Sequence, residues 1–217
     1  MMTSLFSTFD PTTNIIQMNW IIMLTTMFML PKWFWIKKSR WNKLMKMMEK
    51  KLTGEFKTMT HHKEMMILSI STFVMIMMMN IMGLFPYIFT ATSHLSVSLS
   101  IALPMWFMLN IYGWMKYTNN MFKHMLPSGT PMMISPMMIM IETIGNVIRP
   151  ISLSVRLTAN MIAGHLLMTL LGNTASTEKM LITMPLQMML MAFESSISII
   201  QAYVMSTLIT LYSSEIP

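Results

Sequence analysis

Polar side chains that could carry ions recur inside an apolar stretch in the second half of the chain. Between positions 141 and 166 the sequence holds Glu142, Arg149, Arg156, Asn160 and His165 among aliphatic residues. In a bilayer core a charged side chain costs roughly 2.5–3.5 kcal/mol on insertion scales, and such groups usually mark ion pathways or charge-pairing sites. The sequence therefore predicts either an ion path or a docking site for a charge on a partner.

The spacing of these residues distributes them over a helix. At 100° per residue, Glu142, Arg149 and Arg156 follow one another at intervals of seven and lie near one face, about two turns apart. Asn160, four residues after Arg156, shares that face. His165, nine residues after Arg156, points nearly opposite, so we expect it to serve a different compartment or neighbour.

A second polar group lies on the last apolar stretch. Glu194 and Gln201 are seven residues apart, with Ser198 between them, and so share a helix face. Antiparallel pairing across the short gap at 172–179 would bring His165 toward Glu194. Since histidine titrates near neutrality and Glu/His chains recur in proton pathways, this pair predicts a proton relay.

Each of these residues also has a purely structural interpretation. Glu142 and Arg149 could form a mutual ion pair, and His165 and Glu194 could satisfy only each other. Helix packing would account for several other polar side chains, namely Asn160, Ser152, Ser154 and Ser198. Arg156 is different, because its guanidinium is always charged and its own face offers no nearby carboxylate. We expect another subunit to supply that carboxylate.

The composition is that of an integral membrane protein. Of 217 residues, 54% are hydrophobic and 11% charged, whereas a soluble domain carries about 25% charged residues. Several apolar runs reach the roughly 20 residues that a spanning helix needs. We therefore predict an all-α polytopic protein forming a single membrane domain over 1–217.

Methionine is unusually frequent, at 35 residues, and cysteine is absent. A methionine-rich copper site is disfavoured because no thiolate or imidazole ligands are grouped with the methionines. Methionine serves here as an apolar filler, as expected of an AT-rich animal mitochondrial gene in which AUA encodes Met. We expect neither a metal nor a cofactor.

The hydrophobic pattern divides the chain into four parts. We predict a first membrane helix at 15–31, a basic amphipathic surface segment at 32–64, a helical hairpin at 65–115 and a hairpin of two long helices at 132–213. The two long runs would measure about 60 and 48 Å as helices, against about 30 Å of hydrocarbon. They must therefore be strongly tilted or bent, with Pro136, Pro150 and Pro185 as candidate bends; the region 116–131 is expected to be a loop.

Charge predicts the orientation. Residues 32–64 carry ten Lys or Arg and three Glu, which equals the net charge of the whole chain, +7. The positive-inside rule places this segment and the loop at 116–131 on the matrix side, with the N-terminus outside and the C-terminus inside. Interspersed tryptophans favour a helix attracted to anionic lipid over a nucleic-acid surface.

Several segments resemble one family, subunit a of rotary F-type ATP synthases in its animal mitochondrial form. The most specific is Val155–Leu167, which contains Arg-Leu-Thr-Ala-Asn with a histidine nine residues after the arginine. Further similar segments are Leu5–Pro11, Gly83–Tyr87, Thr92–Leu95, Gly129–Pro131, Ile141–Ile144 and Ile200–Val204. The resemblance thus extends over essentially the whole chain.

The resemblance implies a function in proton transport. In that family, two long tilted helices face a rotating ring of c subunits, and the essential arginine, matched by Arg156, faces the ring carboxylates. His165 and Glu194 match the proton-uptake half-channel on the intermembrane-space side. Glu142 matches the acid of the release half-channel on the matrix side.

Other matched positions refine these implications. Asn160 and Gln201 match polar residues flanking the arginine, whereas Arg149 departs from relatives that carry an uncharged amide there. Implied partners are the c-ring, peripheral-stalk and other membrane-sector subunits and the lipids of the mitochondrial inner membrane. No nucleotide or nucleic acid is expected, since the sequence has no Walker-type phosphate loop.

Two other function classes remain open from sequence. A self-contained secondary transporter could place a substrate site between 142 and 156, although such proteins usually have paired halves and no internal repeat is visible. A purely structural membrane subunit would tolerate joint neutralisation of Glu142, Arg156 and Glu194 without loss of proton flux.

Overall fold

The computed structural model describes residues 5–12, 17–21, 23, 37, 39–60, 63–85, 88–126, 129, 131–174 and 180–214. Every regular element within these ranges is helical, which confirms the predicted all-α class. In chain order they are η1 (Leu5–Phe9), η2 (Met18–Trp20), α2 (Arg40–Met59), α3 (Lys63–Gly83), η3 (Ala91–Ser93), α4 (Leu95–Lys116), α5 (Thr118–His124), α6 (Ser135–Thr174) and α7 (Met180–Ser214).

Four of the described helices are long and apolar enough to cross a membrane. They are Glu64–Gly83, Leu95–Lys116, Ser135–Thr174 and Met180–Ser214. The predicted first membrane helix, 15–31, falls largely outside the described residues. These results confirm a polytopic membrane protein.

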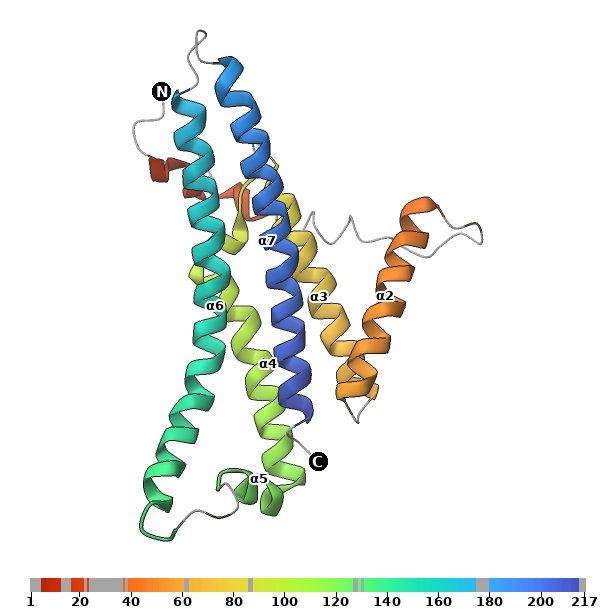
Figure 1. Cartoon of the computed structure of the whole chain (residues 1–217), viewed down its shortest axis with the longest axis vertical. Helices are drawn as coiled ribbons and strands as arrows, with labels where there is room; N and C mark the ends of the chain where they lie inside the picture. The colour runs from red at the N-terminus through yellow and green to blue at the C-terminus, as the bar shows by residue number, and fades with distance from the viewer. Residues whose placement is uncertain are drawn as a thin grey trace.

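A long antiparallel hairpin of α6 and α7 dominates the structure (Figure 1). The main packing partner of α3 is α7, and that of α4 is α6, so α3 and α4 flank the hairpin. We call the end at which α6 ends and α7 begins the η1 end, since η1 lies there. The opposite end, where α6 begins and α7 ends, is the α5 end (Figure 1).

The two long helices are continuous. The 40 residues of α6 and the 35 of α7 contain Pro150 and Pro185, yet neither helix is interrupted at its proline. Pro136 is the second residue of α6, where the missing N–H of proline is tolerated because the first helical N–H groups have no intrahelical partner. At 1.5 Å per residue these helices span about 60 and 50 Å, so each must tilt or curve to fit a bilayer.

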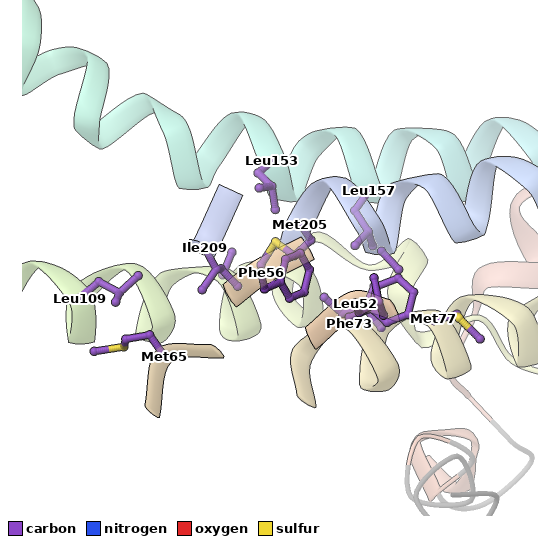
Figure 2. Close-up of a cluster of buried hydrophobic side chains, with 13 residues drawn as sticks. Leu52, Phe56, Met65, Phe73, Met77, Leu109, Leu153, Leu157, Met205 and Ile209 are labelled. Atoms are coloured by element: carbon purple, nitrogen blue, oxygen red, sulfur yellow. The ribbon is translucent and has the colours of Figure 1, made fainter. Parts of the chain in front are cut away.

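A hydrophobic cluster joins five helices (Figure 2). It combines Leu52 and Phe56 of α2, Leu109 of α4, and residues of α3, α6 and α7. The labelled residues from those three helices are Met65, Phe73, Met77, Leu153, Leu157, Met205 and Ile209. Side chains of this size gain roughly 1.5–3 kcal/mol each from full burial against water, but against lipid the gain comes mainly from close packing.

Small hydroxyl residues allow these helices to approach closely. Ser69, Ser154 and Ser206 are at most 1% exposed. Each donates its hydroxyl to a carbonyl three residues earlier on its own helix, at 2.8 Å. The structural interpretation of Ser154 as a helix-packing residue is therefore supported.

The predicted surface segment at 32–64 contains α2, which has two apolar stripes. Met45, Leu52 and Phe56 are buried, and the helix packs against α3 and α7. A second stripe, formed by Trp41, Leu44 and Met48, is exposed. One face of α2 is therefore covered by protein, while the other stays available to lipid.

The polar region after α4 is partly helical, which corrects the expectation of a loop over 116–131. The helix α5 occupies Thr118–His124, so His124 ends a helix and does not lie in a loop. The Phe122 ring packs edge-to-face on Trp114 of α4, with centroids 5.0 Å apart. This aromatic contact holds α5 against the end of α4, and polar composition alone gave no sign of it.

Candidate functional site

A cavity of about 550 Å³ lies at the η1 end of the hairpin. We call it the outer cavity. Its polar lining consists of Ser7, Thr8, Asp10, Thr12, Asn19, Thr90, His165, Thr169, Gln187 and Glu194. The structure thus brings His165 of α6 and Glu194 of α7 to the wall of a single cavity.

The N-terminal segment 5–12 forms part of that wall. The Phe9 carbonyl oxygen lies 3.1 Å from Nε2 of His94, and the Phe9 ring packs edge-to-face against His165, with centroids 6.2 Å apart. His94 itself contacts the rings of Trp20 and Phe89, at 5.4 and 5.3 Å. The sequence resemblance covered this segment but assigned it no role, because nothing local connects Phe9 with a residue 156 positions later.

Two polar atoms at the outer cavity lack partners. Nε2 of His165 and Oε1 of Glu194 are buried and accept or donate no hydrogen bond within the described part of the chain. Burying a polar group without a partner is costly, whereas a cavity of this size has ample room for water. The arrangement therefore suits a hydrated path that presents an imidazole and a carboxyl group to the same solvent.

A second cavity, of about 370 Å³, lies deeper between α3, α6 and α7. We call it the inner cavity. Its polar lining residues are Asn80, Asn160, Glu194, Ser198 and Gln201. The predicted shared face of Glu194, Ser198 and Gln201 is therefore observed, and Glu194 belongs to both cavities.

Asn80 of α3 was not identified from the sequence. Its side chain is 1% exposed, Nδ2 donates to the Ser198 carbonyl at 3.5 Å, and Oδ1 has no partner among the described residues. A lone asparagine in the methionine-rich run of α3 was the only available signal. Asn80 lines the inner cavity together with Glu194.

A third cavity, of about 500 Å³, lies nearer the α5 end. We call it the arginine cavity. It is lined by Arg149, Ser152, Arg156, Leu208, Leu211, Tyr212 and Ser214. Two guanidinium groups thus share a space that is open to the surroundings of the chain.

The two arginines of this cavity differ in their partners. Nη2 of Arg149 lies 3.8 Å from Oε1 of Glu142, and the Arg149 guanidinium lies 5.3 Å from the centre of the Tyr212 ring. The structural ion pair considered from sequence is therefore present, between side chains 35% and 39% exposed. Arg149 is held within its own chain.

Arg156 is exposed and makes no ion pair or hydrogen bond through its side chain with any described residue. The adjacent Leu157 lines the inner cavity instead. Asn160, which the spacing placed on the face of Arg156, also lines the inner cavity. Four residues turn a helix by 400°, so 40° separates the two side chains, and Asn160 is half-buried whereas Arg156 is exposed.

The described residues contain no group of three His, Asp or Glu side chains that could hold a metal ion. The three cavities follow one another along α6 and α7. From the η1 end toward the α5 end they present the imidazole of His165, the carboxyl group of Glu194, the amides of Asn160 and Gln201, and the exposed guanidinium of Arg156. This arrangement can move protons between side chains and water, and it can attract an external anion to Arg156.

The chain is similar to known proteins over its full length. A family profile described as ATP synthase A chain matches residues 14–214. A protein of Locusta migratoria named ATP synthase subunit a is 50% identical over 224 residues, and one of Drosophila melanogaster with the same name is 48% identical over 223 residues. A third, from Aedes albopictus, is 48% identical over 229 residues; each alignment covers 100% of both chains.

Proposed function

This chain belongs to the ATP synthase A chain family, and on that premise we propose that it is the proton-translocating stator subunit of the enzyme's membrane sector. It supplies two offset half-channels and an arginine that faces the carboxylates of a rotating c-ring. The proposed location is the mitochondrial inner membrane, with the N-terminus toward the intermembrane space and the C-terminus toward the matrix.

The observation that carries this proposal is the state of Arg156. Its guanidinium is permanently charged, exposed, and without an ion-pair partner among the described residues. In a membrane such a charge needs an anion to be tolerated. A carboxylate on a neighbouring ring subunit meets that need.

The uptake half-channel consists of the outer and inner cavities. Protons enter from the η1 end through the outer cavity, reach His165 and Glu194, and pass to the inner cavity beside Asn160 and Gln201. Asn160 lies four residues after Arg156 on α6, and Gln201 of α7 lines the same cavity as Asn160, so the two amides would meet an arriving ring carboxylate just before the arginine does.

The release half-channel is the arginine cavity, which lies nearer the α5 end of the hairpin. Attraction between the Arg156 guanidinium and a ring carboxylate favours the ionised carboxylate, since Coulomb energies are large where water is scarce. The proton of that carboxyl group is therefore released as it approaches Arg156. Glu142, the acid nearest this cavity on α6, is the proposed acceptor, and Arg149 holds it in place at 3.8 Å.

The separation of the arginine cavity from the inner cavity couples proton flow to rotation of the ring. Arg156 lines one cavity and Leu157 the other, and the two linings share no described residue. A proton can then cross only by riding on a ring carboxylate. Each charge moved across 100 mV releases about 2.3 kcal/mol, so several protons must be used for each ATP.

The chain binds no nucleotide in this account, and catalysis of ATP formation belongs to other subunits. The transporter alternative receives no support from the arrangement, since the described cavities form a series along one hairpin and no second, equivalent half is present among the described helices. A purely structural role fails to explain why unpartnered polar atoms line the two cavities at the η1 end.

The experiment is substitution of Arg156 by alanine in the assembled enzyme. Removing one member of a buried charge pair costs about 3–5 kcal/mol, so we expect proton-driven ATP synthesis to fall at least about 100-fold. ATP hydrolysis by the soluble head should persist. Retention of proton-driven synthesis in the Arg156→Ala enzyme would refute the proposed role.

A further inference from the structure

The carboxyl group of Glu194 lies directly against the backbone of α6. A Cβ placed on Gly164 would lie 2.8 Å from Cδ, 3.0 Å from Oε1 and 3.2 Å from Cγ of Glu194. These are the three nearest atoms, and all belong to one side chain. The absence of a side chain at Gly164 therefore creates a notch that the Glu194 carboxyl group fills.

This close approach is particular to Gly164. A Cβ on Gly145 or Gly172, the other glycines of α6, would meet nothing within 4 Å. Small residues commonly allow membrane helices to pack, but here the residue opposite Gly164 is an acid, and its Oε1 is buried without a hydrogen-bond partner in the described chain. The notch therefore accommodates a polar group at an energetic cost, which a purely packing role does not require.

The notch also determines how the two cavities are connected. Glu194 and Leu84 are the residues common to the linings of the outer and inner cavities. Leu84 has no group that can carry a proton, whereas the Glu194 carboxyl group does. Passage of a proton from one cavity to the other thus depends on where this carboxyl group is held.

We propose that Gly164 is a positioning residue for proton uptake, whose missing side chain seats the Glu194 carboxyl group as the partition between the outer and inner cavities. This inference rests on the proposed proton-uptake role of Glu194 and adds a residue to it. Gly164 itself carries no proton; it determines which two water-filled spaces the carboxyl group touches.

The test compares Gly164→Ala with Gly145→Ala in the complete, membrane-embedded enzyme. Alanine favours a helix more than glycine does, so neither substitution harms α6 through its backbone preference. With alanine at 164, Cδ of Glu194 must retreat from 2.8 Å to the 3.4 Å at which ordinary contact begins. Misplacement on this scale impairs a proton transfer by about tenfold or more.

The expected results have two parts. Gly164→Ala lowers proton-driven ATP synthesis by about tenfold and displaces the midpoint of its dependence on the pH of the uptake side. Gly145→Ala leaves both the rate and the pH profile unchanged. Equal behaviour of the two variants overturns the inference, as does a lower rate with an unaltered pH profile, which indicates packing alone.

If the Gly164→Ala enzyme fails to assemble, the same substitution can be tested in an enzyme that also carries Glu194→Asp. Glu194→Asp shortens the side chain by one methylene group and withdraws the carboxyl group from the notch. In that background Gly164→Ala should restore assembly, or should lower the rate no further. If the alanine is as damaging there as with Glu194 present, the notch does not act through Glu194 and the inference is wrong.

The inference and the proposed function can fail separately. If Glu194→Gln abolishes proton-driven synthesis while Gly164→Ala matches Gly145→Ala, only the positioning role is lost. If Glu194→Gln leaves synthesis intact, the uptake path itself is wrong.

Discussion

At the η1 end of the α6–α7 hairpin the polar side chains are half-buried and line cavities shared with the segments 7–12 and 84–90, whereas at the α5 end the charged side chains are more exposed. His165 and Glu194 lie in cavities with buried, unpartnered atoms. Glu142 and Arg149 form an ion pair that is more than one third exposed, and Arg156 is exposed as well. The chain thus completes one half of its proposed proton path and leaves the other half open.

This difference indicates where the neighbouring subunit belongs. The outer and inner cavities hold buried polar atoms among residues of this chain, so the chain itself builds much of the proposed uptake path. An exposed guanidinium in a membrane needs an anion to pair with it. The proposed ring therefore meets the hairpin at Arg156.

After the loss expected for Arg156→Ala, the largest fall in proton-driven ATP synthesis is expected from a substitution in the cavities at the η1 end. Glu194→Gln keeps the size of the side chain but cannot exchange a proton, and general acid–base transfer contributes about 100-fold or more. We expect proton-driven ATP synthesis to fall by about that factor. Ser198→Ala, in the same cavity lining, is the matched control and should be nearly neutral, because the Ser198 hydroxyl bonds its own helix at 2.8 Å.

Substitutions of Glu142 and Arg149, at the α5 end, should have an intermediate effect on proton-driven ATP synthesis. If Glu142 accepts released protons, Glu142→Gln slows proton-driven synthesis by about tenfold or more. Arg149→Gln, which removes only the ion pair between exposed groups, should change the rate by about twofold. Equal, small effects of both substitutions would instead assign the pair a structural role, and release would then proceed through water alone.

The smallest effect concerns the wall of the outer cavity. His94→Phe keeps the ring contacts with Trp20 and Phe89 but removes the 3.1 Å hydrogen bond to the Phe9 carbonyl. One such bond contributes about 1 kcal/mol, so hydrogen exchange of residues 5–12 should accelerate about fivefold. Unchanged exchange in this segment would show that His94 does not hold the wall.

Helical periodicity and hydropathy predicted the fold well where one helix is long and apolar. The predicted hairpin of two long helices at 132–213 corresponds to α6 and α7, which span Ser135–Thr174 and Met180–Ser214. The same reasoning missed α5, because five of its seven residues are polar and it is held by the contact between Phe122 and Trp114. Short helices held by tertiary contacts leave little trace in composition.

The candidate site was predictable only in part, for a similar reason. Charges in an apolar run are conspicuous, so Glu142, Arg149, Arg156, His165 and Glu194 could all be identified from the sequence. Asn80 and the N-terminal wall could not be, because their significance depends on contacts between residues more than 100 positions apart. The contact between Gly164 and Glu194 appears only in three dimensions, because the two residues lie on different helices.

If the partner of Arg156 lies on another chain, as we propose, cysteine cross-linking should detect that chain beside it. The chain contains no cysteine, so single cysteines can be introduced by Ser152→Cys and Ser154→Cys. Ser152 is exposed and lines the arginine cavity, whereas Ser154 is 1% exposed. The partner cysteine is placed next to the carboxylate of the ring subunit.

A disulfide requires the two Cα atoms to lie within about 7 Å. We expect rapid cross-linking of the Ser152→Cys chain to the ring subunit and none of the Ser154→Cys chain. Absence of cross-linking from position 152, or equal cross-linking from both positions, would contradict the placement of the ring at Arg156.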